Sequence, residues 1–122
     1  MVRELNKVTT LTGKSGKKYE FSLWSFDEFD DIKRSFRGSG LYLFTNRHKD
    51  ERGAFKHSYI YLGETGDYFT RYDNHHKEKC IVAHNSNCMG FYSMSNSSEE
   101  ERKELEDDLL AAYNFPCNKA DN

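Results

Sequence analysis

Two tyrosines, an arginine and a histidine occur in this sequence at spacings that could support chemistry on a phosphate group. Tyr42 and Tyr61 each lie in a short apolar run typical of a β-strand. Arg71 and His75 are four residues apart, so a helix would place them on one face. An arginine presents a planar fork of donors that matches phosphate oxygens. A tyrosine that acts as a base needs help from a cation or a histidine, because a free phenol has a pKa of about 10. We expect the four side chains to belong to one reaction centre.

Glu106 could supply a metal ligand for the same chemistry. Hydrolysis of a phosphodiester needs an activated water molecule, stabilisation of the phosphate and help for the leaving oxygen. A single carboxylate that acts together with water molecules and substrate phosphate is a typical environment for Mg²⁺. We therefore predict Mg²⁺ or Mn²⁺ as the cofactor, with Glu106 as its ligand. Taken alone, this glutamate among other acidic residues equally fits a solvated helix face.

Hydrophobic periodicity and breaker residues predict the strands and helices that would position these side chains. A helix begins after Asp67 and carries Arg71 and His75. Ser25 with Glu28 and Ser98 with Glu101 match the capping-box pattern of a helix start. The order of elements indicates an α+β domain. Strands are predicted at 18–24, 41–45, 57–63 and 90–95, and further helices at 25–36, 77–85 and 97–113.

The tripeptides Gly40-Leu41-Tyr42 and Tyr61-Leu62-Gly63 resemble the two signature sequences of the GIY-YIG nuclease superfamily. The resemblance runs from about residue 39 to residue 119. Arg71 lies ten residues after Tyr61, as the family's arginine does, and His75 follows four residues later. The resemblance also includes an acidic pattern, which here consists of Glu106, Leu109, Leu110, Tyr113 and Asn118. It implies a small three-stranded antiparallel central sheet flanked by helices, with residues 1–38 as an N-terminal strand-helix extension and residues 39–122 as the nuclease-like domain.

The resemblance also implies roles for the individual residues and a substrate. Tyr42 would act as general base or orient the water molecule, with His75 as its partner, and Tyr61 would position phosphate or water. Arg71 would stabilise the phosphate. Glu106 would bind the metal ion, and Asn118 would shape the end of the site. The expected activity is metal-dependent endonucleolytic hydrolysis of DNA.

Glu64 departs from the family pattern, because some relatives have a lysine three residues after the second tyrosine. A carboxylate at this position adds negative charge beside a phosphate site. This departure and the net charge of −2 favour an alternative function. The alternative is a catalytically weak or silent module of the same fold that binds nucleic acid or another protein.

The segment 46–56 joins the two signature strands and is rich in basic residues. It is predicted to be a long polar loop of a hairpin. A solvated loop and a DNA-contacting loop at the rim of the site are equally consistent with this composition, since phosphate contacts position a duplex without reading its sequence. The candidate DNA-contacting residues are Arg47, Lys49, Arg52 and Lys56.

Three cysteines, Cys80, Cys88 and Cys117, are an odd number with no CxxC spacing, which favours reduced thiols over a disulfide framework. A zinc site is an alternative, because zinc accepts thiolate and imidazole ligands, although the spacings match no common zinc pattern. The candidate zinc ligands are His75, His76, Cys80, His84 and Cys88.

Length and composition limit the number of domains and the cellular location that we expect. The 122 residues suit a single compact domain, and no apolar run approaches the roughly 20 residues of a membrane span. The N-terminus lacks the apolar segment of a signal peptide, so we expect a cytoplasmic protein. Because no separate recognition module is evident, we expect targeting to DNA to come from a homodimer or from a partner protein.

Overall fold

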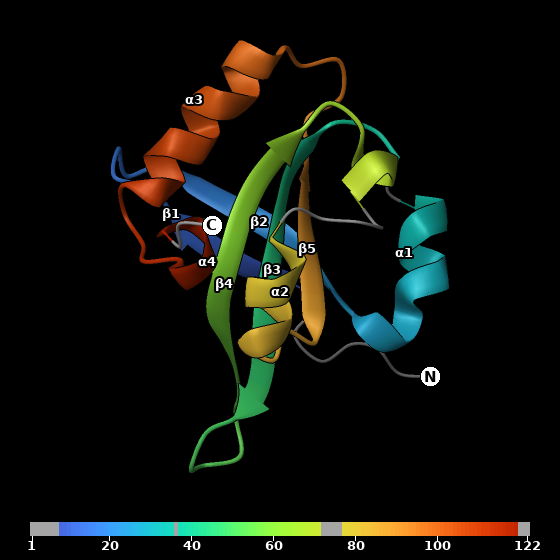
Figure 1. Cartoon of the computed structure of the whole chain (residues 1–122). Coiled ribbons are helices and arrows are strands. Elements are labelled where there is room, and N and C mark those ends of the chain that lie inside the picture. Colours follow the sequence, from blue (N-terminus) through green and yellow to red (C-terminus); the bar gives the residue numbers. More distant parts are fainter. Residues whose placement is uncertain (1–7, 36, 72–76, 120–122) are drawn as a thin grey trace.

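A five-stranded antiparallel sheet forms the centre of the computed structural model, which describes residues 8–35, 37–71 and 77–119. The strand order is β1-β2-β5-β3-β4, and the sheet curls so that β1 and β2 lie behind β3 and β4 (Figure 1). The strands are β1 (Val8–Thr12), β2 (Lys18–Ser25), β3 (Gly40–Lys49), β4 (Phe55–Thr65) and β5 (Cys88–Ser93).

The helices are short. The 3-10 helix η1 (Phe26–Glu28) leads into α1 (Phe29–Ser35), and η2 (Tyr68–Arg71) follows β4. The others are α2 (Glu78–Ala83), α3 (Glu99–Leu110) and α4 (Pro116–Lys119). Two of them, α3 and α4, pack against β4, whereas α1 lies on the other side of the sheet, away from β4 (Figure 1). At the start of α3 both capping-box hydrogen bonds between Ser98 and Glu101 are present, which confirms that prediction.

The predicted three-stranded sheet flanked by helices is wrong. The expected strands are indeed neighbours, as β5-β3-β4, but β2 pairs with β5 and β1 pairs with β2 in the same sheet. The register places Ser22 opposite Phe91 and Leu11 opposite Tyr19. Without β2, the apolar strand β5 would be an exposed edge that invites pairing with other chains. The N-terminal segment is therefore part of the central sheet.

Alternating side chains of the sheet form two separate hydrophobic clusters. The first cluster contains Tyr42, Phe44, Tyr61, Tyr68 and Phe91, together with Ile32 of α1 and Ile81 of α2. The second contains Leu41, Leu43 and Leu62 with Leu109 of α3 and Phe115, and it extends to Leu11, Tyr19 and Phe21 of the N-terminal strands. Helices α2 and α3 therefore pack against opposite faces of the sheet.

The predicted long loop at 46–56 is mostly a β-ribbon. Strands β3 and β4 continue their pairing to Lys49 and Phe55, beyond a register shift at Phe44/Thr45. The turn is short because Asp50 closes it: its carboxylate accepts hydrogen bonds from the backbone N–H groups of Arg52 and Ala54, at 2.8 Å and 2.9 Å. The ribbon projects from the body of the protein (Figure 1).

Among the described residues there is no helix with the length and apolar character that a membrane crossing would require.

Candidate functional site

Tyr42 and Tyr61 lie on neighbouring strands and face the same side of the sheet. Their ring centroids are 6.0 Å apart, and the ring planes are inclined by 41°. Tyr42 is opposite Gly63 in the pairing of β3 with β4, and Tyr61 is opposite Phe44. The side chains are buried, with 1% of Tyr42 and 8% of Tyr61 exposed. The structure therefore brings these two predicted site residues together within the first hydrophobic cluster.

The two signature glycines leave room for tyrosine rings. A Cβ atom at Gly63 would lie 2.5 Å from Cζ of Tyr42, so a larger residue would displace the ring. A Cβ atom at Gly40 would collide with the carbonyl oxygen of Tyr92 and the hydroxyl of Tyr68. The Tyr68 hydroxyl lies 2.8 Å from the Leu41 carbonyl oxygen and 2.9 Å from that of Tyr92, and it bridges β3 and β5. Close packing against tyrosines thus accounts for both glycines in physical terms.

Arg71 and His75 are only partly placed by the structure. Arg71 is the last residue of η2, directly after β4, while its side chain lies outside the described part of the chain. His75 and His76 also lie outside the described residues. The predicted contacts of Arg71 with phosphate and of His75 with Tyr42 remain predictions.

Glu106 lies on α3 in a half-buried environment rich in negative charge. Burial raises the pKa of its carboxyl group to about 7, and the charges of Glu64 and Asp107 add to this effect, whereas Lys103 opposes it. Helix α3 packs on the face of the sheet that bears Leu62 and Glu64, while the rings of Tyr42 and Tyr61 lie on the other face. A substrate that contacts both sets of residues would have to reach around the edge strand β4.

Glu64, the departure from the family pattern, is paired with two basic residues of α3. Its carboxylate accepts a hydrogen bond from Nε of Arg102 at 2.9 Å and lies 3.7 Å from Nζ of Lys103. Arg102 is buried and also donates to the carbonyl oxygen of Ser97 at 2.6 Å. Because its charge is largely balanced by this pair, Glu64 has a clear structural role in attaching α3 to β4.

Asn118 pairs with the backbone of the second signature tripeptide. Its Oδ1 accepts a hydrogen bond from the N–H of Leu62, and its Nδ2 donates to the carbonyl oxygen of the same residue, both at 2.8 Å. Strand β4 is an edge strand of the described sheet, so these groups would otherwise lack a strand partner. The side chain of Asn118 thus replaces a neighbouring strand between Tyr61 and Gly63.

The basic residues predicted to contact DNA are spread over the projecting ribbon. The guanidinium of Arg47 lies 5.2 Å and the ammonium of Lys49 lies 5.4 Å from the ring centre of Phe55, so both share one face with it. Lys56 is on the other face, 3.9 Å from the carboxylate of Asp50, and Arg52 lies in the turn. The arrangement offers positive charge on both sides of an extended hairpin.

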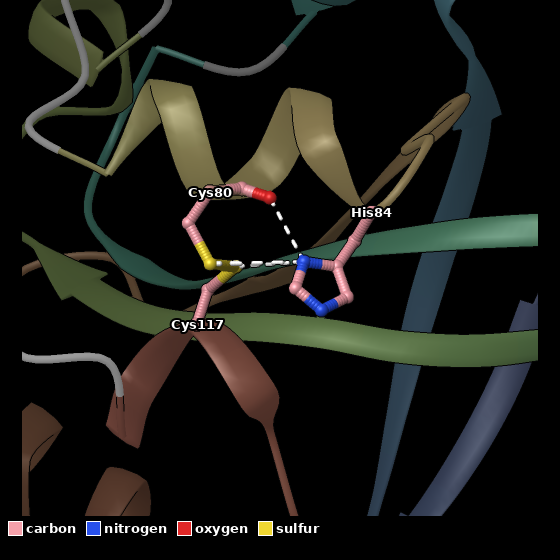
Figure 2. Close-up of side chains that lie close together, drawn as sticks. All are labelled: Cys80, His84 and Cys117. Atoms are coloured by element: carbon pink, nitrogen blue, oxygen red, sulfur yellow. Dashed lines mark hydrogen bonds between the residues drawn. A yellow bond between two sulfur atoms is a disulfide. The ribbon is translucent and has the colours of Figure 1, made fainter.

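The prediction of reduced thiols is wrong for two of the three cysteines. Cys80 of α2 and Cys117 of α4 form a disulfide across 37 residues, and His84 lies beside it (Figure 2). Cys88 is a free, buried cysteine on β5. Among the zinc ligands predicted from sequence, Cys80 and His84 are together, one helical turn apart. Their partner is Cys117, which sequence spacing could not identify because packing alone brings α4 to α2.

An open groove of about 640 Å³ lies between the β1–β2 turn and α3, away from the paired tyrosines. Asp108 lines this groove and is tied to that turn by hydrogen bonds from Ser15 and Tyr19. These bonds hold the pKa of Asp108 below its ordinary value. The groove residues therefore serve mainly to attach α3 to the N-terminal hairpin.

Replacing Glu106 with glutamine should stabilise the protein above pH 7 and have little effect below pH 4.5. The carboxyl group binds its proton more tightly in the folded state, where its pKa is raised from 4.5 to about 7. The native protein therefore loses stability as the pH rises through this window. One pKa unit corresponds to about 1.4 kcal/mol, and solvent screening reduces the effect, so we expect a gain of about 2 kcal/mol near pH 8.

Urea unfolding in EDTA at the two ends of this pH range, followed by Trp24 fluorescence, measures the change. Glu100→Gln is the matched control, because Glu100 is an exposed residue of the same helix. An equal effect of Glu106→Gln at both pH values would contradict the expected burial of its charge.

No protein-family description, curated protein or solved structure matches this chain.

Proposed function

We propose that this protein is a divalent-metal-dependent endonuclease that hydrolyses DNA phosphodiester bonds with a GIY-YIG type of site. The observation that carries the proposal is the pairing of Tyr42 and Tyr61 on adjacent strands, with rings 6.0 Å apart over a glycine that makes room for one of them. Arg71 follows the second strand in a short 3-10 helix, and Asn118 holds the backbone between Tyr61 and Gly63. These placements support the roles that the sequence resemblance implies.

In this reaction Arg71, Tyr42 and Tyr61 would position the water molecule and the phosphate group. The guanidinium of Arg71 matches two phosphate oxygens and would stabilise the charge that develops on them. The hydroxyl groups of Tyr42 and Tyr61 would orient the attacking water molecule and accept its hydrogen bonds. Both tyrosines are buried, so this use requires that their hydroxyl groups become exposed when DNA binds.

The carboxyl group of Glu106 has the chemistry of a cation ligand. Its pKa is raised to about 7 by burial and by Glu64, so its charged form lacks sufficient compensation in the protein alone. A divalent cation would supply that compensation and hold the carboxylate in its ionised form. Because α3 and the tyrosine rings lie on opposite faces of the sheet, a phosphate that contacts both would have to reach around β4. When bound, Mg²⁺ or Mn²⁺ would polarise a phosphate in that position and lower the pKa of a bound water molecule.

The projecting ribbon would hold the DNA backbone. Arg47 and Lys49 on one face, Lys56 on the other and Arg52 in the turn present positive charge on the ribbon, which projects at the end of the molecule opposite the acidic helix α3 (Figure 1). Such contacts bind phosphate without reading sequence, so they would contribute affinity rather than specificity. A second copy of the chain or a partner protein would then direct the protein to its DNA target.

Nicking of supercoiled plasmid in Mg²⁺ or Mn²⁺, with EDTA as the blank, tests the proposal. We expect Tyr42→Phe, Glu106→Gln and Arg71→Ala each to lower the rate by at least about 100-fold, the usual effect of removing a general base or a charge stabiliser. Glu100→Gln should retain full activity. Because Glu106→Gln is expected to stabilise the protein near pH 8, its loss of activity at that pH could not be attributed to unfolding.

Equal nicking by the native protein and by Glu106→Gln would overturn the proposal, because the activity would then come from a contaminant or from another site. Absence of nicking by the native protein with both metals would overturn it as well.

The burial of the tyrosines favours a second candidate function, a catalytically silent module that binds nucleic acid or protein. Tyr42 is 1% exposed and packs in the core, Glu64 is engaged with Arg102, and Asn118 completes a strand edge. Each of these residues has a structural role that needs no substrate. Fluorescence anisotropy with labelled duplex DNA separates the two candidates: the silent module would bind in a salt-dependent manner without nicking, and Glu106→Gln would leave its affinity unchanged.

A further inference from the structure

Cys80, His84 and Cys117 form a compact group of potential metal ligands on the α2 side of the sheet. Their ligand atoms all lie within 4.8 Å of one another. Cys80 lies within α2, His84 is the C-cap residue of that helix four positions later, and Cys117 comes from α4 (Figure 2). The sulfur of Cys117 is buried, while His84 is exposed, so the group is open to solvent on the histidine side.

The distances from the imidazole to the two sulfur atoms match those of a zinc site. Nδ1 of His84 lies 3.7 Å from Sγ of Cys80 and 3.6 Å from Sγ of Cys117. With Zn–S bonds of about 2.3 Å and Zn–N bonds of about 2.1 Å, a tetrahedral ion separates a sulfur ligand from a nitrogen ligand by about 3.6 Å. Two thiolates on one ion lie about 3.8 Å apart, so the disulfide must be reduced before both can bind zinc.

We propose that the reduced pair Cys80 and Cys117, together with His84, binds one Zn²⁺ ion, and that oxidation to the disulfide releases it. Binding removes one proton from each thiol and forms two Zn–S bonds and one Zn–N bond. Nδ1 of His84 now lies 3.0 Å from the carbonyl oxygen of Cys80; as a zinc ligand it would leave this contact, and the ring proton would reside on Nε2. A water molecule completes the tetrahedron at the exposed side.

The release step uses a disulfide or a peroxide as the oxidant. With glutathione disulfide, the two thiolates transfer two electrons, the protein disulfide forms, and two glutathione thiols and one Zn²⁺ ion leave. Two protons from solvent complete the balance. Thiolates bound to zinc are suited to this exchange because they are held in the deprotonated form.

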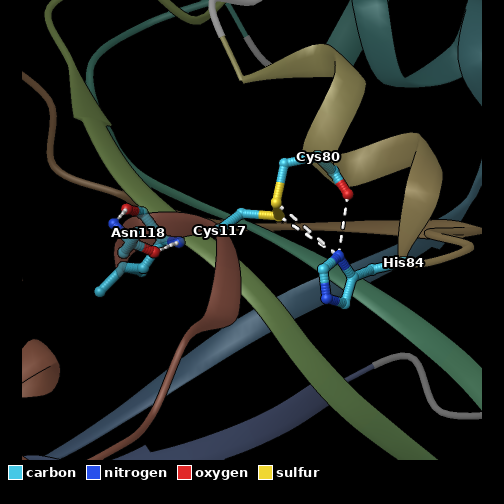
Figure 3. The surroundings of a disulfide bond; sticks show 5 residues. Cys80, His84, Cys117 and Asn118 are labelled. Atoms are coloured by element: carbon cyan, nitrogen blue, oxygen red, sulfur yellow. Dashed lines mark hydrogen bonds between the residues drawn. A yellow bond between two sulfur atoms is a disulfide. The ribbon is translucent and has the colours of Figure 1, made fainter. Parts of the chain in front are cut away.

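The disulfide-bonded state and the zinc-bound state would each connect α2 to α4. Helix α4 also carries Asn118, whose side chain pairs with the backbone of Leu62 in β4 (Figure 3). Either the disulfide or the zinc ion would hold α4 in place, whereas the reduced, metal-free protein would lack this connection. The proposal does not depend on nuclease activity, since it concerns only these ligands.

Zinc titration of the full chain under anaerobic reducing conditions tests the proposal, with a chromophoric chelator as competitor. We expect about one Zn²⁺ per reduced chain and none for the oxidised chain. Co²⁺ should give the thiolate charge-transfer absorption and the visible bands of a tetrahedral site. Loss of a ligand in Cys117→Ser or His84→Ala should weaken zinc binding by at least about 100-fold, more than is typical when only a supporting residue is lost.

Cys88→Ala and His48→Ala are the matched controls, because Cys88 is on β5 and His48 is on the projecting ribbon. Both should bind zinc as the native chain does. Glutathione disulfide added to the zinc-loaded protein should release the metal with two glutathione thiols per ion. The proposal is overturned if the reduced chain binds no stoichiometric zinc, if Cys117→Ser binds it equally well, or if oxidation leaves the metal bound.

Discussion

Gly40→Ala should destabilise the protein by about 4 kcal/mol, through backbone strain of about 2 kcal/mol and a similar cost of overpacking. Gly40 has a φ angle of 154°, which side-chain-bearing residues rarely adopt. Its new Cβ would meet the backbone carbonyl oxygen of Tyr92, and a backbone atom cannot rotate away. It would also push the Tyr68 hydroxyl from the carbonyl oxygens of Leu41 and Tyr92. Urea unfolding followed by Trp24 fluorescence measures the loss.

Two further glycines give the matched comparison for this result. Gly38→Ala should change stability by less than about 0.5 kcal/mol, because a Cβ at Gly38 would contact nothing within 4 Å. Gly63→Ala should destabilise by about 2 kcal/mol, since the obstacle is the movable ring of Tyr42. In the Tyr42→Leu background the cost of Gly63→Ala should fall, whereas that of Gly40→Ala should not. Equal costs at Gly38 and Gly40 would contradict the packing described for the first tripeptide.

Reduction of the disulfide between Cys80 and Cys117 should lower the free energy of unfolding by about 4 kcal/mol, as expected for a bond that closes a loop of 37 residues. The main reason is that the reduced unfolded chain has many more conformations to lose on folding. Urea unfolding with and without a phosphine reductant, in EDTA to exclude metal binding, measures the difference. Hydrogen exchange should show the earliest loss of protection at the Leu62 N–H, which Asn118 of α4 covers.

The double variant Cys80→Ser/Cys117→Ser provides the control for this measurement. It should have the stability of the reduced native protein and should not respond to the reductant. Cys88→Ala should respond as the native protein does, because Cys88 is not part of the disulfide. If the native protein is equally stable with and without reductant, α4 is held by its other contacts and the disulfide has little effect on the fold.

Zinc binding by the reduced protein should offset the loss of the disulfide. A ligand that binds only the folded state at 1,000 times its dissociation constant adds about 4.1 kcal/mol of stability, similar to the expected contribution of the disulfide. Zinc added to the reduced native protein should therefore restore much of the lost stability. The double serine variant should show no such recovery.

Local patterns in the sequence predict several of the strands and helices that the structure contains. The short apolar runs in 41–45 and 57–63 and the capping residues Ser98 and Glu101 act over a few positions, so local physics suffices to predict two strands and a helix. The polar segment between these strands predicts a hairpin, and a hairpin places Tyr42 and Tyr61 on neighbouring strands, as the structure shows.

Which distant segments meet is known only from the packing of the whole chain. The edge of β5 is covered by β2, Glu64 pairs with Arg102, and Cys80 bonds to Cys117 across 37 residues. No local pattern specifies such partners, because they depend on which faces and edges remain to be covered once the elements form. For the same reason the sequence placed Glu106 with the tyrosines, whereas α3 packs on the opposite face, where Leu62 and Glu64 are the residues that need a partner.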